Sequence, residues 1–192
     1  MAENKVVFGL KNAHYAVITE DETNGITYGT PEPLPGSVEL ALEARGDQVE
    51  FYADDMLFYS ASNNQGYDGT LTIAKVTEQF RQDVLGEELE ATDSVLIEKQ
   101  DAKPKNFALM FEFDGDQKAT RHLLYNCSAS RPSVTSSTRT DAVEPSTAEL
   151  TFIASPREED KAVKVSTTGD TEATVYDNWY DAVYEPGTTA GA

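Results

Sequence analysis

The stretch that decides the fold is residues 106–132, which read NFALMFEFDGDQKATRHLLYNCSASRP. Apolar side chains recur in it at every second position, at Phe107, Leu109, Phe111 and Phe113. Because strand side chains alternate between two faces, this spacing predicts a strand with one continuous apolar face. Asp114-Gly115 predicts the turn that follows, since glycine takes positive φ without a Cβ clash. Residues 119–127 would then form the return strand of a β-hairpin.

Similar alternation predicts further strands along the chain. They fall at 6–17, 38–42, 69–73, 95–98, 148–154 and 162–165. Several short strands separated by turn signals indicate a mainly β (α+β) fold, an antiparallel β-sandwich or partly closed barrel.

One flanking helix is expected, with Thr77 as its cap, Phe80 and Val84 on one face and Gly86 at its end. A second helix is expected near the C-terminus, where Thr174 and Asp177 would form a capping box. Its apolar face would carry Val175, Trp179 and Val183.

The domain organisation follows from length and composition. A chain of 192 residues can bury one substantial core, so residues 1–186 are expected to form a single domain. Within it, 131–147 is rich in Ser and Thr and predicts a polar surface loop. The small, polar residues 187–192 predict a flexible C-terminal tail.

Residues 43–66 predict an extended arm or hairpin. Six of its side chains are candidate subunit-interface residues, namely Phe51, Tyr52, Asp54, Asp55, Phe58 and Tyr59. The aromatic residues do not fall on one face, and an isolated two-stranded hairpin is marginal in water. A partner on another subunit would resolve this, although an ordinary hairpin of the domain's own core fits the same residues.

The charge of the chain limits its partners. Fifteen basic against 34 acidic side chains give a net charge of −19, which disfavours binding to nucleic acids and to anionic membranes. Residues 1–60 are strongly acidic, whereas 103–139 hold more basic than acidic side chains. Such a distribution suits head-to-tail pairing of copies, but it also fits two solvated faces. The N-terminus has no signal-peptide pattern and no stretch is long enough to span a membrane, so no membrane association is expected.

No catalytic, cofactor or metal site is predicted. Cys127 is the single cysteine, which excludes an internal disulfide and a cysteine-rich zinc site. Strand alternation places it on the side of Leu123 and Tyr125, as a buried and inert thiol. His14 and His122 belong to no metal-binding motif, and we expect both to be structural and hydrogen-bonded.

Residues 113–127, FDGDQKATRHLLYNC, followed by SRP at 130–132, resemble the major tail proteins of long, non-contractile-tailed bacteriophages that infect Gram-positive hosts. Other parts of the chain resemble the same family in the same order. They are VFGLKN (7–12), HYA (14–16), FYAD (51–54), NQGY (64–67), EP (144–145), ASP (154–156) and Trp179.

That resemblance implies a tail tube subunit, which is a structural virion protein and not an enzyme. Six copies would close a ring, and stacked rings would form the hollow tube that delivers DNA. The implied partners are further copies of the chain, the tape-measure protein, and the tail terminator and distal tail proteins. DNA would pass through without specific binding, and no cofactor is implied. The protein would reside in the phage tail after assembly in the host cytoplasm.

Two other classes of function stay open on the residues alone. Nine Tyr and one Trp could line the sugar site of a glycan-binding virion decoration module. Pairs of carboxylates could serve a glycoside hydrolase, because the geometry of such pairs comes from the fold and not from sequence spacing.

Overall fold

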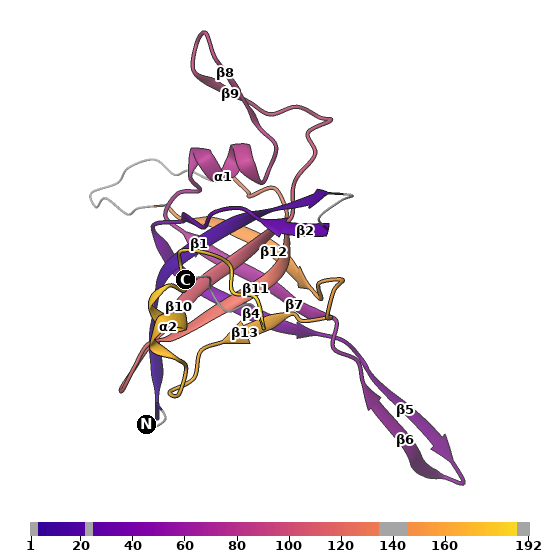
Figure 1. Cartoon of the computed structure of the whole chain (residues 1–192). Helices are drawn as coiled ribbons and strands as arrows, with labels where there is room; N and C mark the ends of the chain where they lie inside the picture. Colours follow the sequence, from indigo (N-terminus) through magenta and orange to yellow (C-terminus); the bar gives the residue numbers. More distant parts are fainter. Residues whose placement is uncertain (1–3, 22–24, 135–145, 188–192) are drawn as a thin grey trace, which may run out of the picture.

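A computed structural model describes residues 4–21, 25–134 and 146–187 (Figure 1). Its strands are β1 (Val7–Asp21), β2 (Gly25–Tyr28), β3 (Glu32–Pro33), β4 (Ser37–Arg45), β5 (Gln48–Ala53), β6 (Met56–Ser62), β7 (Gly66–Ile73), β8 (Glu88–Glu90), β9 (Val95–Ile97), β10 (Phe107–Gly115), β11 (Thr120–Ala129), β12 (Ala148–Ser155) and β13 (Lys164–Ser166). Its helices are α1 (Glu78–Asp83) and α2 (Ala173–Asp177). None of the helices in these ranges is long and apolar enough to cross a membrane.

The main sheet is antiparallel and curls into a partly closed barrel. Its strand order is β2-β1-β10-β11-β12-β7-β4, with β3 paired to β1 and β13 paired to β11. β4 at one end of this order comes back near β1 at the other. The backbone of the segment between β3 and β4 bridges the gap: the Leu34 amide donates to the Ala13 carbonyl and the Ala74 amide donates to the Gly36 carbonyl, each at 2.8 Å. The expected mainly β fold with a flanking helix is confirmed.

Two apolar clusters lie on the two faces of this sheet. The inner cluster fills the barrel and includes Phe107, Phe152 and, from α1, Phe80. The outer cluster includes Met110 and Tyr125 from the sheet, covered by Trp179 and Val183 from the C-terminal segment. β10 is buried on both faces as a result, and the chain after β13 forms a second layer over the outer face (Figure 1).

The predicted hairpin forms, but its turn lies later than Asp114-Gly115. β10 runs to Gly115, and residues 116–119 connect it to β11. β1 extends the strand, because Phe8 pairs with Asp114 and Val7 with Gly115. The Asn4 side chain then holds the turn: its Oδ1 accepts from the amides of Gln117 and Lys118 at 3.0 and 3.1 Å.

Cys127 is fully buried, as expected, and burial raises the pKa of its thiol. It does not share a side with Leu123 and Tyr125, however. An irregularity in the β10–β11 register, between the pairs Phe107–Cys127 and Leu109–Leu124, inserts one residue into β11. Cys127 therefore joins Leu124 inside the barrel, while Leu123 and Tyr125 belong to the outer cluster.

The first predicted helix is confirmed and the second is shorter than expected. The Thr77 hydroxyl accepts from the Phe80 amide at 3.2 Å and caps α1. α2 ends at Asp177, and its N-cap residue is Glu172, which makes no side-chain cap bond. The capping box at Thr174 was therefore wrong, although Trp179 and Val183 do pack together as predicted.

Candidate assembly interface

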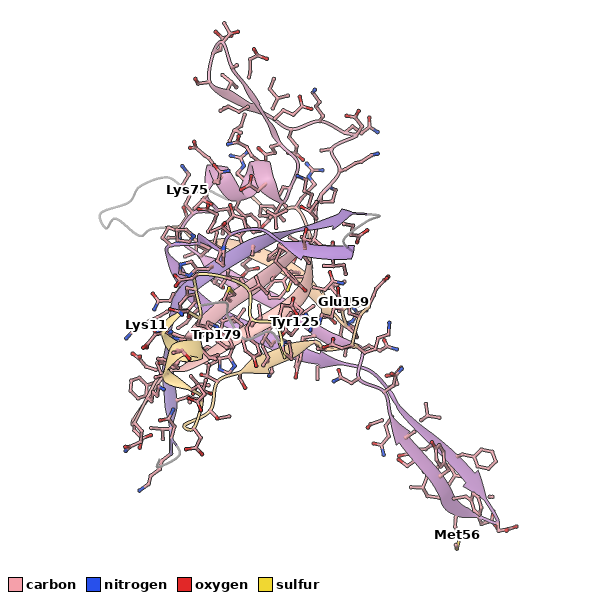
Figure 2. All side chains as sticks on the ribbon, in the orientation of Figure 1. Lys11, Met56, Lys75, Tyr125, Glu159 and Trp179 are labelled. Carbon is pink, nitrogen blue, oxygen red and sulfur yellow. The ribbon has the colours of Figure 1, made fainter. Side chains whose placement is uncertain are left out.

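The β5–β6 hairpin projects from the barrel as an arm (Figure 1). All six predicted interface residues lie on it, and none of their side chains is buried. Figure 2 shows Met56 at the far tip, remote from Tyr125 and Trp179 in the body. We use the name arm for residues 46–65 from here on.

The tip of the arm is a two-residue turn made by Asp54 and Asp55. Both adopt positive φ, at 53° and 57°, and Ala53 pairs with Met56 across them. Positive φ at both central positions is the type I′ geometry, whose twist matches that of a hairpin. Aspartate tolerates the left-handed region better than most residues, so the turn places two carboxylates side by side in solvent.

Two glycines form the neck of the arm. Gly46 has φ of 128°, and a Cβ there would overlap the backbone of Asn63. Gly66 has φ of 98°, and a Cβ there would overlap the carbonyl oxygen of Ala154. The chain can therefore leave β4 and enter β7 only where no side chain blocks the crossing.

The apolar side chains of the arm point to both sides because its ladder is irregular. Phe51 pairs with Tyr59 but Tyr52 pairs with Leu57, so one extra residue, Phe58, is inserted into β6. Phe58 is 73% exposed, and its main ring contact is edge-on to Phe51 at 6.4 Å. Tyr52 donates its hydroxyl to Glu50 at 2.7 Å, and this bond raises the pKa of Tyr52. The arm thus carries two apolar faces and buries neither.

The other end of the molecule carries a second hairpin (Figure 1). β8 and β9 form the hairpin, with Leu89, Val95 and Ile97 exposed. Beside its base lies a groove of about 450 Å³, lined by α1, the start of β12 and residues 131–134. Its floor includes Val76 and Leu85. This size falls in the range of about 300–1,000 Å³ that binding sites occupy.

Charged side chains surround the groove. Lys75 and Arg131 are at its rim, with side chains 78% and 80% exposed. Arg81 also lines it and forms an ion pair with the buried Glu87, 2.8 Å from its Nε to Oε1 and 2.7 Å from its second nitrogen to Oε2. Both carboxylate oxygens of Glu87 lie within 3 Å of the Arg81 guanidinium and are paired with it. Arg131 contacts Glu98.

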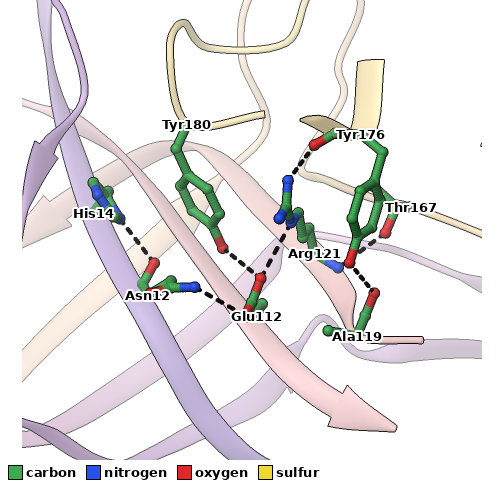
Figure 3. A network of polar contacts seen from close by, with 8 residues as sticks. All are labelled: Asn12, His14, Glu112, Ala119, Arg121, Thr167, Tyr176 and Tyr180. Carbon is green, nitrogen blue, oxygen red and sulfur yellow. Dashed lines mark hydrogen bonds and ion pairs between the residues drawn. The ribbon is translucent and has the colours of Figure 1, made fainter. Parts of the chain in front are cut away.

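A buried polar network lies on the outer face of the sheet (Figure 3). Glu112 is only 6% exposed, and its oxygens accept from Asn12 at 2.9 Å and from Arg121 at 3.1 Å. Arg121 also donates to the Tyr176 carbonyl and stacks on the Tyr176 ring at 3.9 Å. The Tyr180 hydroxyl points at Glu112, and burial raises the pKa of Tyr180.

This network has a structural role. Every charged group in it has a partner, and it joins β1, β10 and β11 to the C-terminal segment (Figure 3). A second cluster, centred on Arg157, also contacts the C-terminal segment. Arg157, 3% exposed, donates to Asp160 at 2.7 and 2.8 Å and to Glu185 at 2.6 Å, over the ring of Tyr125. Its guanidinium holds the pKa of Asp160 well below the usual range.

Among the described residues, no group of three His, Cys, Asp or Glu side chains is placed to hold a metal ion. The two histidines differ. The Nδ1 of His14 lies 2.9 Å from the Asn12 carbonyl. His122 instead stacks on Phe111 at 5.1 Å, and its buried Nδ1 has no hydrogen-bond partner among the described residues. Burial lowers the pKa of His122 to about 4.

The sequence analysis missed the groove and the buried network. The network left one signal, because Glu112 is the single charged residue in the run 107–113. A buried charge requires a partner, and Arg121 occupies the facing position on the return strand. The groove left no signal, since its lining comes from segments far apart in sequence.

Comparison with known proteins finds similarity only among solved structures. No family model matches the chain, and no curated protein matches it. The cap of the anti-feeding prophage tube aligns over 87% of this chain and 96% of its own, with a TM-score of 0.49 and 10% identity. The sheath–tube complex of an extracellular contractile injection system aligns over 85% and 93%, with a TM-score of 0.45 and 12% identity. The sheath/tube terminator of that system aligns over 81% and 93%, with a TM-score of 0.44 and 10% identity. At these values the likeness does not assign a function.

Proposed function

We propose that this chain is a structural subunit of a protein tube, of the kind that forms a phage tail tube. Copies would close into rings, with six as the number that the sequence resemblance implies, and the rings would stack. The observation that carries this proposal is the projecting arm, which has apolar side chains on both faces and pairs with no further strand in the described part of the chain.

The energetic argument concerns exposed surface. Seven large apolar side chains of the arm are each 48–73% exposed: Val49, Phe51, Tyr52, Met56, Leu57, Phe58 and Tyr59. Covering a side chain of this size contributes about 1.5–3 kcal/mol when burial is complete. A soluble monomer rarely exposes a large contiguous apolar patch, and such patches mark contacts with other proteins. The arm therefore fits a protein that completes its burial by association.

The barrel offers a second adhesive feature, the open edge of β4. β4 pairs with β7 along its length, and no other strand of the described chain pairs with it. An exposed edge presents unpaired N–H and C=O groups that can pair with another chain. An isologous or closing heterologous contact through such an edge yields a closed assembly.

The charge of the chain suits a conduit for DNA. With a net charge of −19, the wall of a tube would repel the duplex and keep it from binding. Basic inner walls would instead hold phosphates by releasing counterions. We therefore propose a net negative lumen and no duplex binding at physiological salt.

The test is assembly by the purified protein, observed by light scattering and negative-stain microscopy. Wild-type protein should form rings or tubes at high concentration. Changing both Phe51→Ser and Tyr52→Ser should abolish assembly and leave the circular dichroism and thermal unfolding of the monomer unchanged. The exchange Phe51→Tyr with Tyr52→Phe keeps the apolar rings and is the matched control.

Two results would contradict the proposal. One is a wild-type protein that stays monomeric at every concentration and salt. The other is a serine variant whose monomer unfolds, which would assign the arm to the domain's own core.

The alternative of a glycan-binding module has less support. Sugar sites stack their ligands on aromatic rings, yet no aromatic side chain lines the groove. The exposed aromatics lie on a projecting hairpin, not in a concavity. Specific binding of cell-wall glycan by the monomer would favour that alternative, and hydrolysis of glycan would favour a carboxylate enzyme.

A further inference from the structure

We propose that the tip of the arm of one copy docks in the groove beside α1 of the next copy, so that copies join head to tail. This inference rests on the proposed function and names the partner surface of the arm. It depends on three observations: the positions of the two features, their charges and their apolar side chains.

The arm and the groove lie at opposite ends of the molecule. In Figure 2, Met56 marks the tip of the arm at one end, and Lys75 marks the rim of the groove near the other. A contact between them cannot close within one chain, and two copies that lie in the same orientation, as in a stack, can make it in one direction only. It is a heterologous contact, which repeats from copy to copy and leads to extended stacks.

The charges of the two surfaces are complementary. The arm contains Asp47, Glu50, Asp54 and Asp55, and it contains no basic residue. Among the described residues that line the groove, three side chains are basic (Lys75, Arg81 and Arg131) and two are acidic (Glu87 and Glu98), a balance of +1 in a chain of −19. Both acidic residues are already engaged by Arg81 and Arg131. Lys75 at the rim pairs only loosely with Glu78, at 3.5 Å, and can turn toward the carboxylates of an incoming tip.

The apolar parts also match. Met56 and Phe58, near the tip, are 66% and 73% exposed. The floor of the groove presents Val76 and Leu85, and Val134 at its edge is 95% exposed. Docking would cover both sets, while Asp54 and Asp55 reach the basic rim. The contact then has an apolar centre and a charged margin, the arrangement usual in protein interfaces.

Cysteine cross-linking tests the contact directly. Cys127 is the single native cysteine and is fully buried, so it contributes no background. The variant Met56→Cys with Val134→Cys, assembled under the conditions in which wild-type protein forms tubes, should form disulfide-linked dimers and longer species on mild oxidation. The matched control pairs Met56→Cys with Glu159→Cys, which lies in the exposed loop after β12, away from the groove (Figure 2).

The outcomes separate this inference from the proposed function. Cross-linking through position 134 but not through position 159 supports docking in the groove. Tubes without a cross-link at 134, or with equal cross-linking at both positions, overturn the docking and leave the tube subunit intact. Wild-type protein that never assembles overturns the proposed function itself.

A charge variant gives a second, independent measurement. Asp54→Asn with Asp55→Gly removes both carboxylates and keeps a turn, because Asn-Gly is the preferred type I′ pair. We expect the concentration needed for tube growth to rise severalfold, and its dependence on salt to weaken. The removal of two exposed charges by Glu158→Gln and Glu159→Gln is matched in net charge and should change neither. An unchanged threshold in the tip variant would contradict the role of the two aspartates.

Discussion

The barrel of this chain buries its apolar side chains, whereas the arm exposes them. In the barrel, Phe107 and Tyr125 are fully buried, and even the charged Glu112 and Arg157 are enclosed with partners. In the arm, Phe58 and its neighbours face solvent on both sides. The barrel is stabilised by its own contacts, whereas the arm has surface that only another molecule can cover. The predictions below test this difference.

The largest difference is expected between aromatic truncations in the two regions. Phe107→Ala removes a ring that packs against Phe80 at 5.4 Å and Phe152 at 6.4 Å, and it should lower the free energy of unfolding by about 3–5 kcal/mol. Phe58→Ala removes an equally large ring from the arm and should change it by less than about 0.5 kcal/mol. Denaturant unfolding of the dilute monomer measures both. Comparable losses would mean that the arm belongs to the folding unit.

A glycine at the neck should matter more than one at the surface. Gly66→Ala combines positive φ with overlap on the Ala154 carbonyl, so the backbone must shift. We expect a loss of roughly 1–3 kcal/mol from strain alone and a displaced arm that no longer supports assembly. Gly187→Ala has a similar φ of 80° but open space around it, and it should cost about 1 kcal/mol or less. Thermal unfolding measures the loss of stability, and microscopy measures the loss of assembly. Equal results for the two variants would mean that the glycine at the neck has no special role.

The buried network should be worth more than a surface ion pair. Glu112→Gln keeps the shape of the side chain but removes the charge that faces Arg121, and it should cost roughly 1–3 kcal/mol. Lys11→Met breaks the more exposed pair with Asp114 and should lower the free energy of unfolding much less, because exposed ion pairs contribute little. Chemical denaturation compares them. If Lys11→Met were the more harmful change, the attachment of the C-terminal segment would have to rest on packing alone.

The last difference concerns the dependence of stability on pH. Burial lowers the pKa of His122 from 6.5 to about 4, so the unfolded chain binds a proton more readily than the folded one between these values. Stability should therefore fall as pH drops from about 6.5 to 4. Below that range, this group should cause no further loss of stability. His122→Gln should flatten this part of the profile. Unfolding curves across the range measure the slope, and an identical slope in the variant would mean that other groups cause it.

Local patterns predicted much of the barrel. The two-residue alternation of 107–113 indicated a strand, and Thr77 with Phe80 indicated the capped start of α1. Both signals come from side chains that are close in sequence. Over such short stretches, backbone geometry alone determines which face of the strand or helix each side chain lies on. The mixed sides of the aromatics at 51–59 left two interpretations open, an arm and a hairpin of the core, and the irregular ladder at Phe58 gives the reason for the mixed sides.

Other features could not be predicted locally because partners distant in sequence decide them. The side on which Cys127 lies depends on one extra residue in β11, and the turn after β10 depends on pairing with Val7 and Phe8. The enclosure of Glu112 depends on a C-terminal segment more than 60 residues away along the chain.

The sequence by itself therefore determined the β-rich class, the capped helix and the acidic character of this protein. These follow from spacing, composition and charge, which need no knowledge of the tertiary structure. Only the tertiary structure decided that the arm points away from the groove, that the rim of the groove is basic and that the buried Arg157 and the partly buried Arg121 hold the C-terminal segment. Those features arise where strands distant in sequence meet, and the free energy of burying and pairing their side chains exists only once the sheet has curled.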